Sequence, residues 1–134
     1  MELRKEFETA QFRKGLEIRQ AVLGEEYVKN SVANVSEFMV SQQKLVTEYC
    51  WGEVWTRDGL SLKSRSMINL AMLAALNRPN ELKLHVLGAL NNGVTEEEMQ
   101  EVFLQVSIYC GVPAGLDSAK VANEVIAKLK ANKT

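Results

Sequence analysis

The chain contains 134 residues, of which 46% are hydrophobic and 25% are charged, a composition typical of one folded domain spanning residues 1–134. Its 16 basic and 17 acidic side chains almost cancel, and no run of Lys and Arg is long enough to follow a phosphate backbone, which excludes nucleic acid as a partner. The amino terminus is charged and the apolar runs are short, so we expect a cytoplasmic protein without a signal peptide or a membrane span.

The first predicted helix covers residues 2–23, in which Leu3, Phe7 and Ala10 form one apolar stripe. Gly24 suits the position that ends a helix. We expect a short, poorly defined segment over residues 27–34. A second helix is predicted from an N-cap at Ser36 to about Thr56, where turn-forming residues follow. The helical period recurs along the chain and alternation does not, so the predicted fold class is all-α, with about six helices.

The third predicted helix follows a cap at Ser61, and its interior from Met67 to Leu76 is apolar all round except for Asn69. Such a helix must be covered on every side, either by the rest of the domain or by other subunits. Pro79 ends it and opens a fourth helix, because proline lacks the amide donor that an uninterrupted helix needs.

Two further helices are predicted after Gly93, which lies just past the end of the fourth helix. Thr95 and Glu98 have the spacing of a capping box at the start of the fifth helix. Gly111 ends this helix and Pro113 opens the last one.

The cysteines and the single histidine indicate neither a disulfide nor a metal centre. Cys50 and Cys110 lie far apart without CxxC spacing, and we expect both to be buried, reduced side chains. One histidine without clustered cysteines makes no transition-metal site, so no metal is predicted.

His85 is the candidate proton carrier, since only its side chain has an ordinary pKa near neutrality. Gly88 and Ala89 follow one turn later and leave space for a ligand above the ring, while Glu81 is placed to orient it. The simpler alternative is a histidine on the helix surface paired with Glu81.

Charged side chains near residues 53–65 allow two interpretations each. Glu53 and Arg57 have the spacing of an ordinary helical ion pair, but Glu53 also stands where the pattern calls for an apolar side chain, as a carboxylate facing a cleft would. Lys63 and Arg65 place cations at the amino end of a helix, where the macrodipole favours anions. A bound anionic substrate would balance them, and so would solvent.

Aromatic side chains gather in the same region. Trp51, Trp55 and Tyr49 are interpreted first as core or subunit-contact residues and second as pocket walls. Cys110 lies on a predicted apolar helix face, where packing is favoured over a nucleophilic role.

Several blocks of the sequence together resemble the carboxymuconolactone decarboxylase family. They span nearly the whole chain and occur in order, at residues 15–28, 49–60, 65–79, 85–95 and 109–115. The resemblance implies an all-helical fold shared with the alkylhydroperoxidase D family and a ring-like homo-oligomer, usually a hexamer, with a trimer as the other expected size. Peroxidase relatives carry CxxC where this chain has Arg78 and Glu81, so their thiol chemistry is not expected. Asp58 stands where many relatives have proline, which alters the loop beside Arg57.

The resemblance implies decarboxylation of a small dianionic lactone, 4-carboxymuconolactone or a related acid, without a cofactor. We expect His85 to donate a proton or polarise the lactone, Arg57 and Arg65 to bind the two carboxylates, and Glu53 to orient His85 or Arg57. Further expected substrate contacts are Trp55, Tyr49 and Cys110. Two alternatives stay open: a redox or peroxidase-like protein using Cys50 or Cys110, and a non-catalytic helical oligomer that binds a small acid or another protein.

Overall fold

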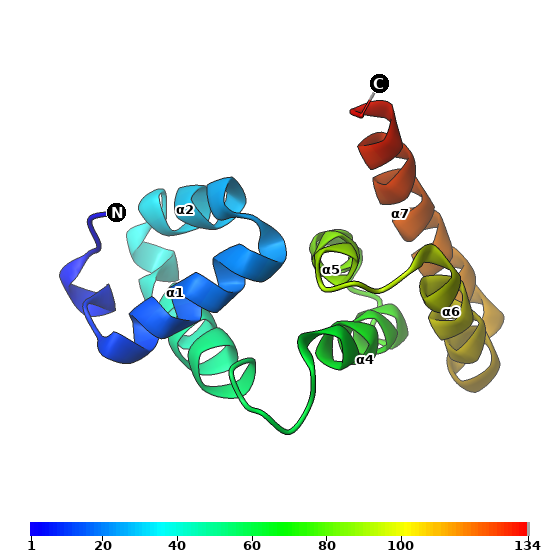
Figure 1. Cartoon of the computed structure of the whole chain (residues 1–134), viewed down its shortest axis with the longest axis horizontal. Coiled ribbons are helices and arrows are strands. Elements are labelled where there is room, and N and C mark those ends of the chain that lie inside the picture. Colours follow the sequence, from blue (N-terminus) through cyan, green and yellow to red (C-terminus); the bar gives the residue numbers. More distant parts are fainter. Residues whose placement is uncertain (134) are drawn as a thin grey trace. The chain divides into compact units, whose positions relative to one another are not determined.

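The computed structural model describes residues 1–133, and these residues form two compact units, residues 1–61 and residues 62–133 (Figure 1). Every regular element in the described residues is helical, which confirms the all-α prediction. The described part of the chain contains no helix with the length and apolar character that crossing a lipid bilayer requires.

The first unit opens with a short 3-10 helix, η1 (Lys5–Phe7), followed by α1 (Ala10–Leu23) and α2 (Glu25–Ala33). Thr9 caps α1 by accepting a hydrogen bond from the Phe12 amide at 3.0 Å, so α1 begins later than the predicted helix over residues 2–23. Gly24 ends α1 with a φ of 99°, as expected. The prediction of a poorly defined segment over residues 27–34 is wrong, because Val28 and Val32 bury one face of α2.

The segment predicted as one helix over residues 36–56 is helical but not uniform. It consists of η2 (Glu37–Met39), α3 (Val40–Lys44) and the π-helix η3 (Leu45–Val54). Ser36 occupies the N-cap position of η2 with an extended backbone, as predicted, but its side chain makes no cap bond. The π-helical pattern is evident where the Trp55 amide donates to the Cys50 carbonyl, five residues earlier, at 3.0 Å.

The α1 and η3 backbones approach one another closely at Gly15. A Cβ atom at this position would lie 1.8 Å from the Thr47 carbonyl oxygen, so no larger residue fits. Next to this contact the buried guanidinium of Arg19 donates hydrogen bonds to the Gln43 Oε1 at 2.6 Å and to the Thr47 Oγ1 at 3.1 Å. The first unit is therefore held together in part by buried polar contacts.

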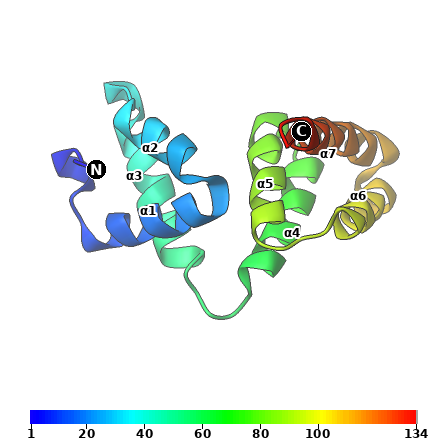
Figure 2. The same ribbon diagram turned by 45° about the horizontal axis from the view of Figure 1, so that its top comes forward.

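The second unit contains four helices, α4 (Leu62–Ala75), α5 (Pro79–Asn91), α6 (Glu96–Cys110) and α7 (Val112–Ala131). Helices α4 and α5 form a hairpin, and α6 packs along α7 (Figures 1 and 2). Between them lies an apolar core that includes Leu70, Leu82, Val86 and Phe103.

The boundaries of these helices agree with the local sequence signals. Pro79 occupies the first turn of α5, and Gly93 and Gly111 adopt φ values of 88° and 103° after α5 and α6. The Thr95–Glu98 capping box is present in both directions, each bond being 3.0 Å long. These four predictions are confirmed.

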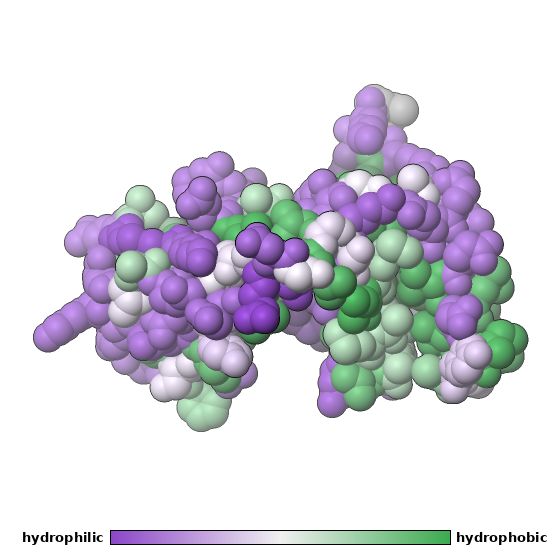
Figure 3. Space-filling view, turned by 60° about the horizontal axis from the view of Figure 1, so that its bottom comes forward, coloured by the Kyte–Doolittle hydropathy of each residue, from purple (hydrophilic) through white to green (hydrophobic). Residues whose placement is uncertain are grey.

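The second unit leaves part of α4 and much of α6 uncovered. Figure 3 shows hydrophobic side chains gathered on one face of this unit. Large exposed apolar side chains on α4, α6 and the start of α7 are Ile68, Met72, Leu104, Ile108, Tyr109, Val112 and Leu116. The apolar interior of α4 is therefore not covered on every side within its own unit.

Candidate functional site

The predicted site residues are divided between the two units. Tyr49, Glu53, Trp55 and Arg57 belong to residues 1–61, whereas Arg65, His85 and Cys110 belong to residues 62–133. Each set is positioned by the helices of its own unit.

Three of the predicted residues of the first unit line one small hollow of about 360 Å³. Tyr49, Glu53 and Arg57 line it together with Gln11, Glu48 and Val54. The Gln11 side chain donates a hydrogen bond from Nε2 to the Glu53 Oε2 at 3.2 Å, which fixes the carboxylate from α1. Glu53 is exposed, so it faces solvent rather than filling an apolar position. The hollow combines a cation, two carboxylates and an aromatic ring.

Glu48 is the carboxylate of this hollow that sequence reasoning missed. It accepts hydrogen bonds from the Thr9 Oγ1 at 2.8 Å and from the Lys44 Nζ at 3.3 Å. The hydrogen bond from Thr9 and, after it, the one from Lys44 hold the pKa of Glu48 below its ordinary value. Glu48 is thus stabilised in its charged form.

The π-helical geometry explains why Glu48 was missed. Residues five apart, such as Glu48 and Glu53, lie on nearly opposite faces of an α-helix but on neighbouring positions of a helix with i to i+5 hydrogen bonds. The hydrophobic pattern carried no sign of this change in period.

Trp55 packs inside the first unit rather than on the hollow. Its ring stacks on Trp51 with centroids 4.4 Å apart and an interplanar angle of 19°. Both indoles are buried, which supports the first interpretation of these side chains as core residues. Tyr49 differs, since it is 60% exposed at the rim of the hollow.

His85 lies in the middle of α5 and is only 7% exposed. The alternative of a histidine on the helix surface is therefore wrong. Its Nδ1 lies 3.5 Å from the Nδ2 of Asn69, which projects from the middle of α4. In the sequence, Asn69 stands out only as the polar residue of an apolar helix. Its contact with His85 depends on how α4 packs against α5, which the sequence pattern does not show. Gly88 and Ala89, expected to leave space beside the ring, are themselves buried.

Arg65 lies four residues before Asn69 on α4, so the two side chains share a helix face. The neighbouring cation, Lys63, pairs with the Glu98 carboxylate at 3.1 Å. Part of the positive charge at the amino end of α4 is therefore balanced by the capping residue of α6 rather than left for a ligand.

Both cysteines are exposed, so the expectation that they are buried is wrong. Cys110 borders an apolar hollow of about 540 Å³ together with Met67, Ile68, Val102 and others of α4 and α6. The predicted apolar face of α6 ends one turn before Cys110, because Met99, Phe103 and Val106 are the members that reach the core.

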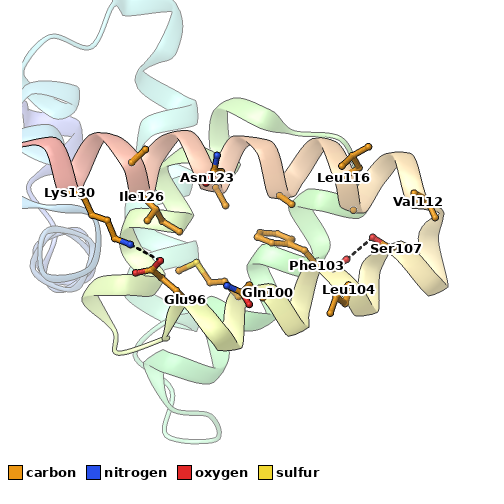
Figure 4. A pocket seen from close by; sticks show the side chains of 15 residues that line it. Glu96, Gln100, Phe103, Leu104, Ser107, Val112, Leu116, Asn123, Ile126 and Lys130 are labelled. Atoms are coloured by element: carbon orange, nitrogen blue, oxygen red, sulfur yellow. Dashed lines mark hydrogen bonds and ion pairs between the residues drawn. The ribbon is translucent and has the colours of Figure 1, made fainter.

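A further hollow of about 610 Å³ lies along α6 and α7 (Figure 4). Apolar side chains such as Phe103, Leu116 and Ile126 line most of it, and Lys130 pairs with Glu96 at 3.1 Å at one end. None of the predicted site residues lines it. It offers an apolar surface rather than acid–base chemistry.

The chain is similar to a known protein family and to several known proteins. The model of the carboxymuconolactone decarboxylase family matches residues 42–124, a range that contains every predicted site residue. The chain is 41% identical over 118 residues to a 4-carboxymuconolactone decarboxylase of Acinetobacter baylyi, covering 88% of each chain. It is 42% identical over 115 residues to a nitrosuccinic acid decarboxylase of Metarhizium robertsii, covering 86% of this chain and 80% of that one. An uncharacterised 15.0 kDa protein of Paracoccus denitrificans is 31% identical over 84 residues, covering 60% of this chain and 62% of that one.

Proposed function

Because the chain belongs to the carboxymuconolactone decarboxylase family, we propose that it is a carboxy-lyase that converts 4-carboxymuconolactone, or a closely related lactone acid, to 3-oxoadipate enol-lactone and carbon dioxide. The observation that carries this proposal is the 41% identity to a decarboxylase of that name over 88% of both chains. Two relatives named as decarboxylases support the reaction class.

The substrate of this reaction contains its own electron sink, the conjugated lactone carbonyl. The departing carboxylate is attached to a ring carbon that a double bond connects to the lactone carbonyl. When the bond between the ring carbon and the carboxylate breaks, its electron pair moves into the conjugated double bond and carbonyl. A dienolate forms, with negative charge on the carbonyl oxygen of the lactone. The protein has to bind a dianion, stabilise the developing charge and allow a proton to reach the carbon next to the carbonyl. No cofactor is required for these tasks.

We assign these tasks to the residues predicted from the sequence. His85 donates the proton or polarises the lactone; its burial supports this role, because hydrogen bonds to developing charge are stronger away from water. Arg57 and Arg65 bind the carboxylates, and Glu53, fixed by Gln11, orients His85 or Arg57. Tyr49, Trp55 and Cys110 remain predicted substrate contacts, although the burial of Trp55 favours an indirect role.

Nitrosuccinic acid is the second candidate substrate, because a relative named for it is 42% identical over 86% of this chain. It is also a small dicarboxylic acid. Its nitro group accepts the electron pair as a nitronate when the neighbouring carboxylate leaves, so the demands on the protein are the same. The two substrates differ in shape, which makes them a direct test of specificity.

The test is incubation of the purified protein with each acid while carbon dioxide release and ultraviolet absorbance are followed. We expect release from carboxymuconolactone, and release that is slower by roughly 10²–10⁴-fold with His85→Asn. Faster release from nitrosuccinate would favour the second candidate. Thermal stabilisation by both acids without release from either would contradict the proposed function and favour a non-catalytic binder.

The redox alternative is tested by replacing Cys50 and Cys110 with serine. Serine keeps a polar group of similar size but cannot cycle through a disulfide or a sulfenic acid. We expect the double variant to retain decarboxylation, and loss of a thiol-dependent peroxidase activity would instead favour the redox alternative.

We further propose that the protein acts as a homo-oligomer, a hexamer or a trimer, in the cytoplasm. The exposed apolar side chains of α4, α6 and α7 support self-association, since contiguous apolar surface commonly marks protein interfaces (Figure 3). Light scattering of the purified protein measures the size of the assembly, and a monomer at micromolar concentration would contradict this part of the proposal.

A further inference from the structure

Asn69 occupies an unfavourable place for an amide. It is the polar residue within the apolar stretch from Met67 to Leu76, and asparagine is a poor helix former because its side chain competes with the backbone for hydrogen bonds. A hydrophobic residue would suit this position of α4 better. The contact with His85 is a reason for an amide at this position, since the amide can hold the imidazole ring by a hydrogen bond.

The geometry of this contact restricts the chemistry of the imidazole. The Asn69 Nδ2 lies 3.5 Å from the His85 Nδ1, at the long end of the hydrogen-bonding range. With the amide nitrogen facing the ring, Nδ1 is the acceptor, because an amide NH2 group only donates. In the neutral ring the single proton then lies on Nε2. The imidazolium form is disfavoured, because its Nδ1–H would point at another donor.

We propose that Asn69 is a positioning residue that keeps His85 neutral and in the Nε2–H tautomer, so that His85 polarises the substrate rather than acting as a cationic acid. This inference rests on the proposed function and chooses between the two roles given to His85 there. A neutral imidazole with a fixed N–H is an effective hydrogen-bond donor to a developing oxyanion.

The reaction then balances as follows. The bond between the ring carbon and the carboxylate breaks, carbon dioxide leaves, and the electron pair forms the dienolate. His85 donates a hydrogen bond from Nε2 to the carbonyl oxygen of the lactone and keeps its proton throughout. Water supplies the proton that joins the carbon next to the carbonyl, and the carbonyl is restored.

The state of the ring can be measured directly, because the chain has one histidine. Two-bond proton–nitrogen correlation spectra of the nitrogen-15-labelled protein, recorded above the titration midpoint of the ring, distinguish the two tautomers. We expect a protonated Nε2 and a bare Nδ1. A protonated Nδ1 would mean that the amide oxygen faces the ring, and it would overturn the inference.

Asn69→Asp reverses the polarity of the contact while keeping its shape. A carboxylate only accepts, so we expect the neutral ring to carry its proton on Nδ1 and to lose the Nε2–H donor. We expect turnover to fall by roughly 10²–10³-fold, the effect of removing one donor to an oxyanion. Asn80→Asp is the matched control, because Asn80 is exposed at the start of α5, and we expect an unchanged tautomer and turnover.

An Asn69→Asp protein that folds, keeps the Nε2–H tautomer and turns over normally would also overturn the inference. If this variant does not fold, the spectrum of the unaltered protein decides. The two proposals can fail separately: an Nε2–H ring in a protein that decarboxylates neither acid rejects the proposed function alone, whereas an active protein with Nδ1–H rejects the role of Asn69 alone.

Discussion

The two units of the chain hold their functional groups in contrasting ways. In residues 1–61 the charged side chains Glu48, Glu53 and Arg57 line an open hollow, and the helices beneath them are tied by buried polar contacts of Arg19. In residues 62–133 the imidazole of His85 is itself buried, in a unit held by an apolar core and by well-formed caps.

This contrast separates two chemical needs. Recognition of a charged substrate calls for accessible cations that stay hydrated until the ligand arrives, whereas stabilisation of developing charge is stronger away from water. Under the proposed function, Arg57 of the first unit serves binding and His85 of the second unit serves the chemical step. Two variants test this division and two test how each unit is held together, with expected effects that decrease from the first to the last.

His85→Asn should have the largest effect. We expect turnover to fall by roughly 10²–10⁴-fold, as for the loss of an acid–base or polarising group, with little change in the Michaelis constant. Steady-state kinetics measure this, and circular dichroism confirms that the variant folds. Unchanged turnover would remove His85 from the mechanism and the second unit from the chemical step.

Arg57→Gln should weaken binding instead. A charge-assisted hydrogen bond contributes about 1.5–3 kcal/mol, so we expect the Michaelis constant to rise roughly 10- to 100-fold while turnover changes less. Arg13→Gln is the control, since Arg13 is an exposed cation of the same unit that pairs with Glu8. A drop in turnover alone would contradict the assignment of binding to the first unit.

Gly15→Ala tests whether the first unit depends on the close approach of α1 and η3. The added Cβ would lie 1.8 Å from the Thr47 carbonyl oxygen, so the backbones must separate, and we expect the free energy of unfolding to fall by about 1–3 kcal/mol. Chemical denaturation measures the loss. Gly59→Ala is the control, because a Cβ there meets no atom within 4 Å, and an equal loss in both variants would contradict the steric explanation.

Glu98→Gln should have the smallest effect and should depend on pH. The hydrogen bond from the Thr95 amide, followed by the contact with Lys63, holds the pKa of Glu98 below its ordinary value. Because the folded pKa lies below the unfolded one, the charged cap stabilises the protein above the unfolded pKa, about 4.3 for glutamate, and this stabilisation is lost as the pH falls through the folded pKa.

We therefore expect Glu98→Gln to be less stable than the unaltered protein at pH 7 and the difference to shrink by pH 3, as measured by urea denaturation. Glu97→Gln removes a charge from the same turn without touching the cap. A pH-independent difference for Glu98→Gln, or an equal one for Glu97→Gln, would show that the cap is not its source.

The sequence predicted the second unit better than the first for a physical reason. Pro79, Gly93, Thr95 and Gly111 act through their own backbone chemistry, so the boundaries they set are visible locally. The first unit depends on α2, which is only 9 residues long, and on a π-helix whose period differs from the one used to find helices.

The same distinction applies to the candidate site. His85 could be identified because it is the single histidine, and Arg57 and Glu53 because their charges interrupt an apolar pattern. Asn69, Gln11 and Glu48 could not, since their roles arise only when α4 meets α5 and α1 meets η3. Tertiary register, rather than residue type, makes them partners.

Because η3 is a π-helix, the placement of the side chains that line the hollow depends on the number of residues in this stretch. A deletion of one residue within Leu45–Val54 would allow this stretch to wind as an ordinary α-helix, at a gain in backbone hydrogen-bond geometry. Where the deletion falls outside Glu48–Glu53, these two carboxylates stay five residues apart and would lie on nearly opposite faces of the α-helix. The hollow would then lose one of its carboxylates even though every charged residue was retained. In aligning distant relatives, a one-residue gap in this stretch would accordingly be a stronger sign of altered substrate choice than many substitutions.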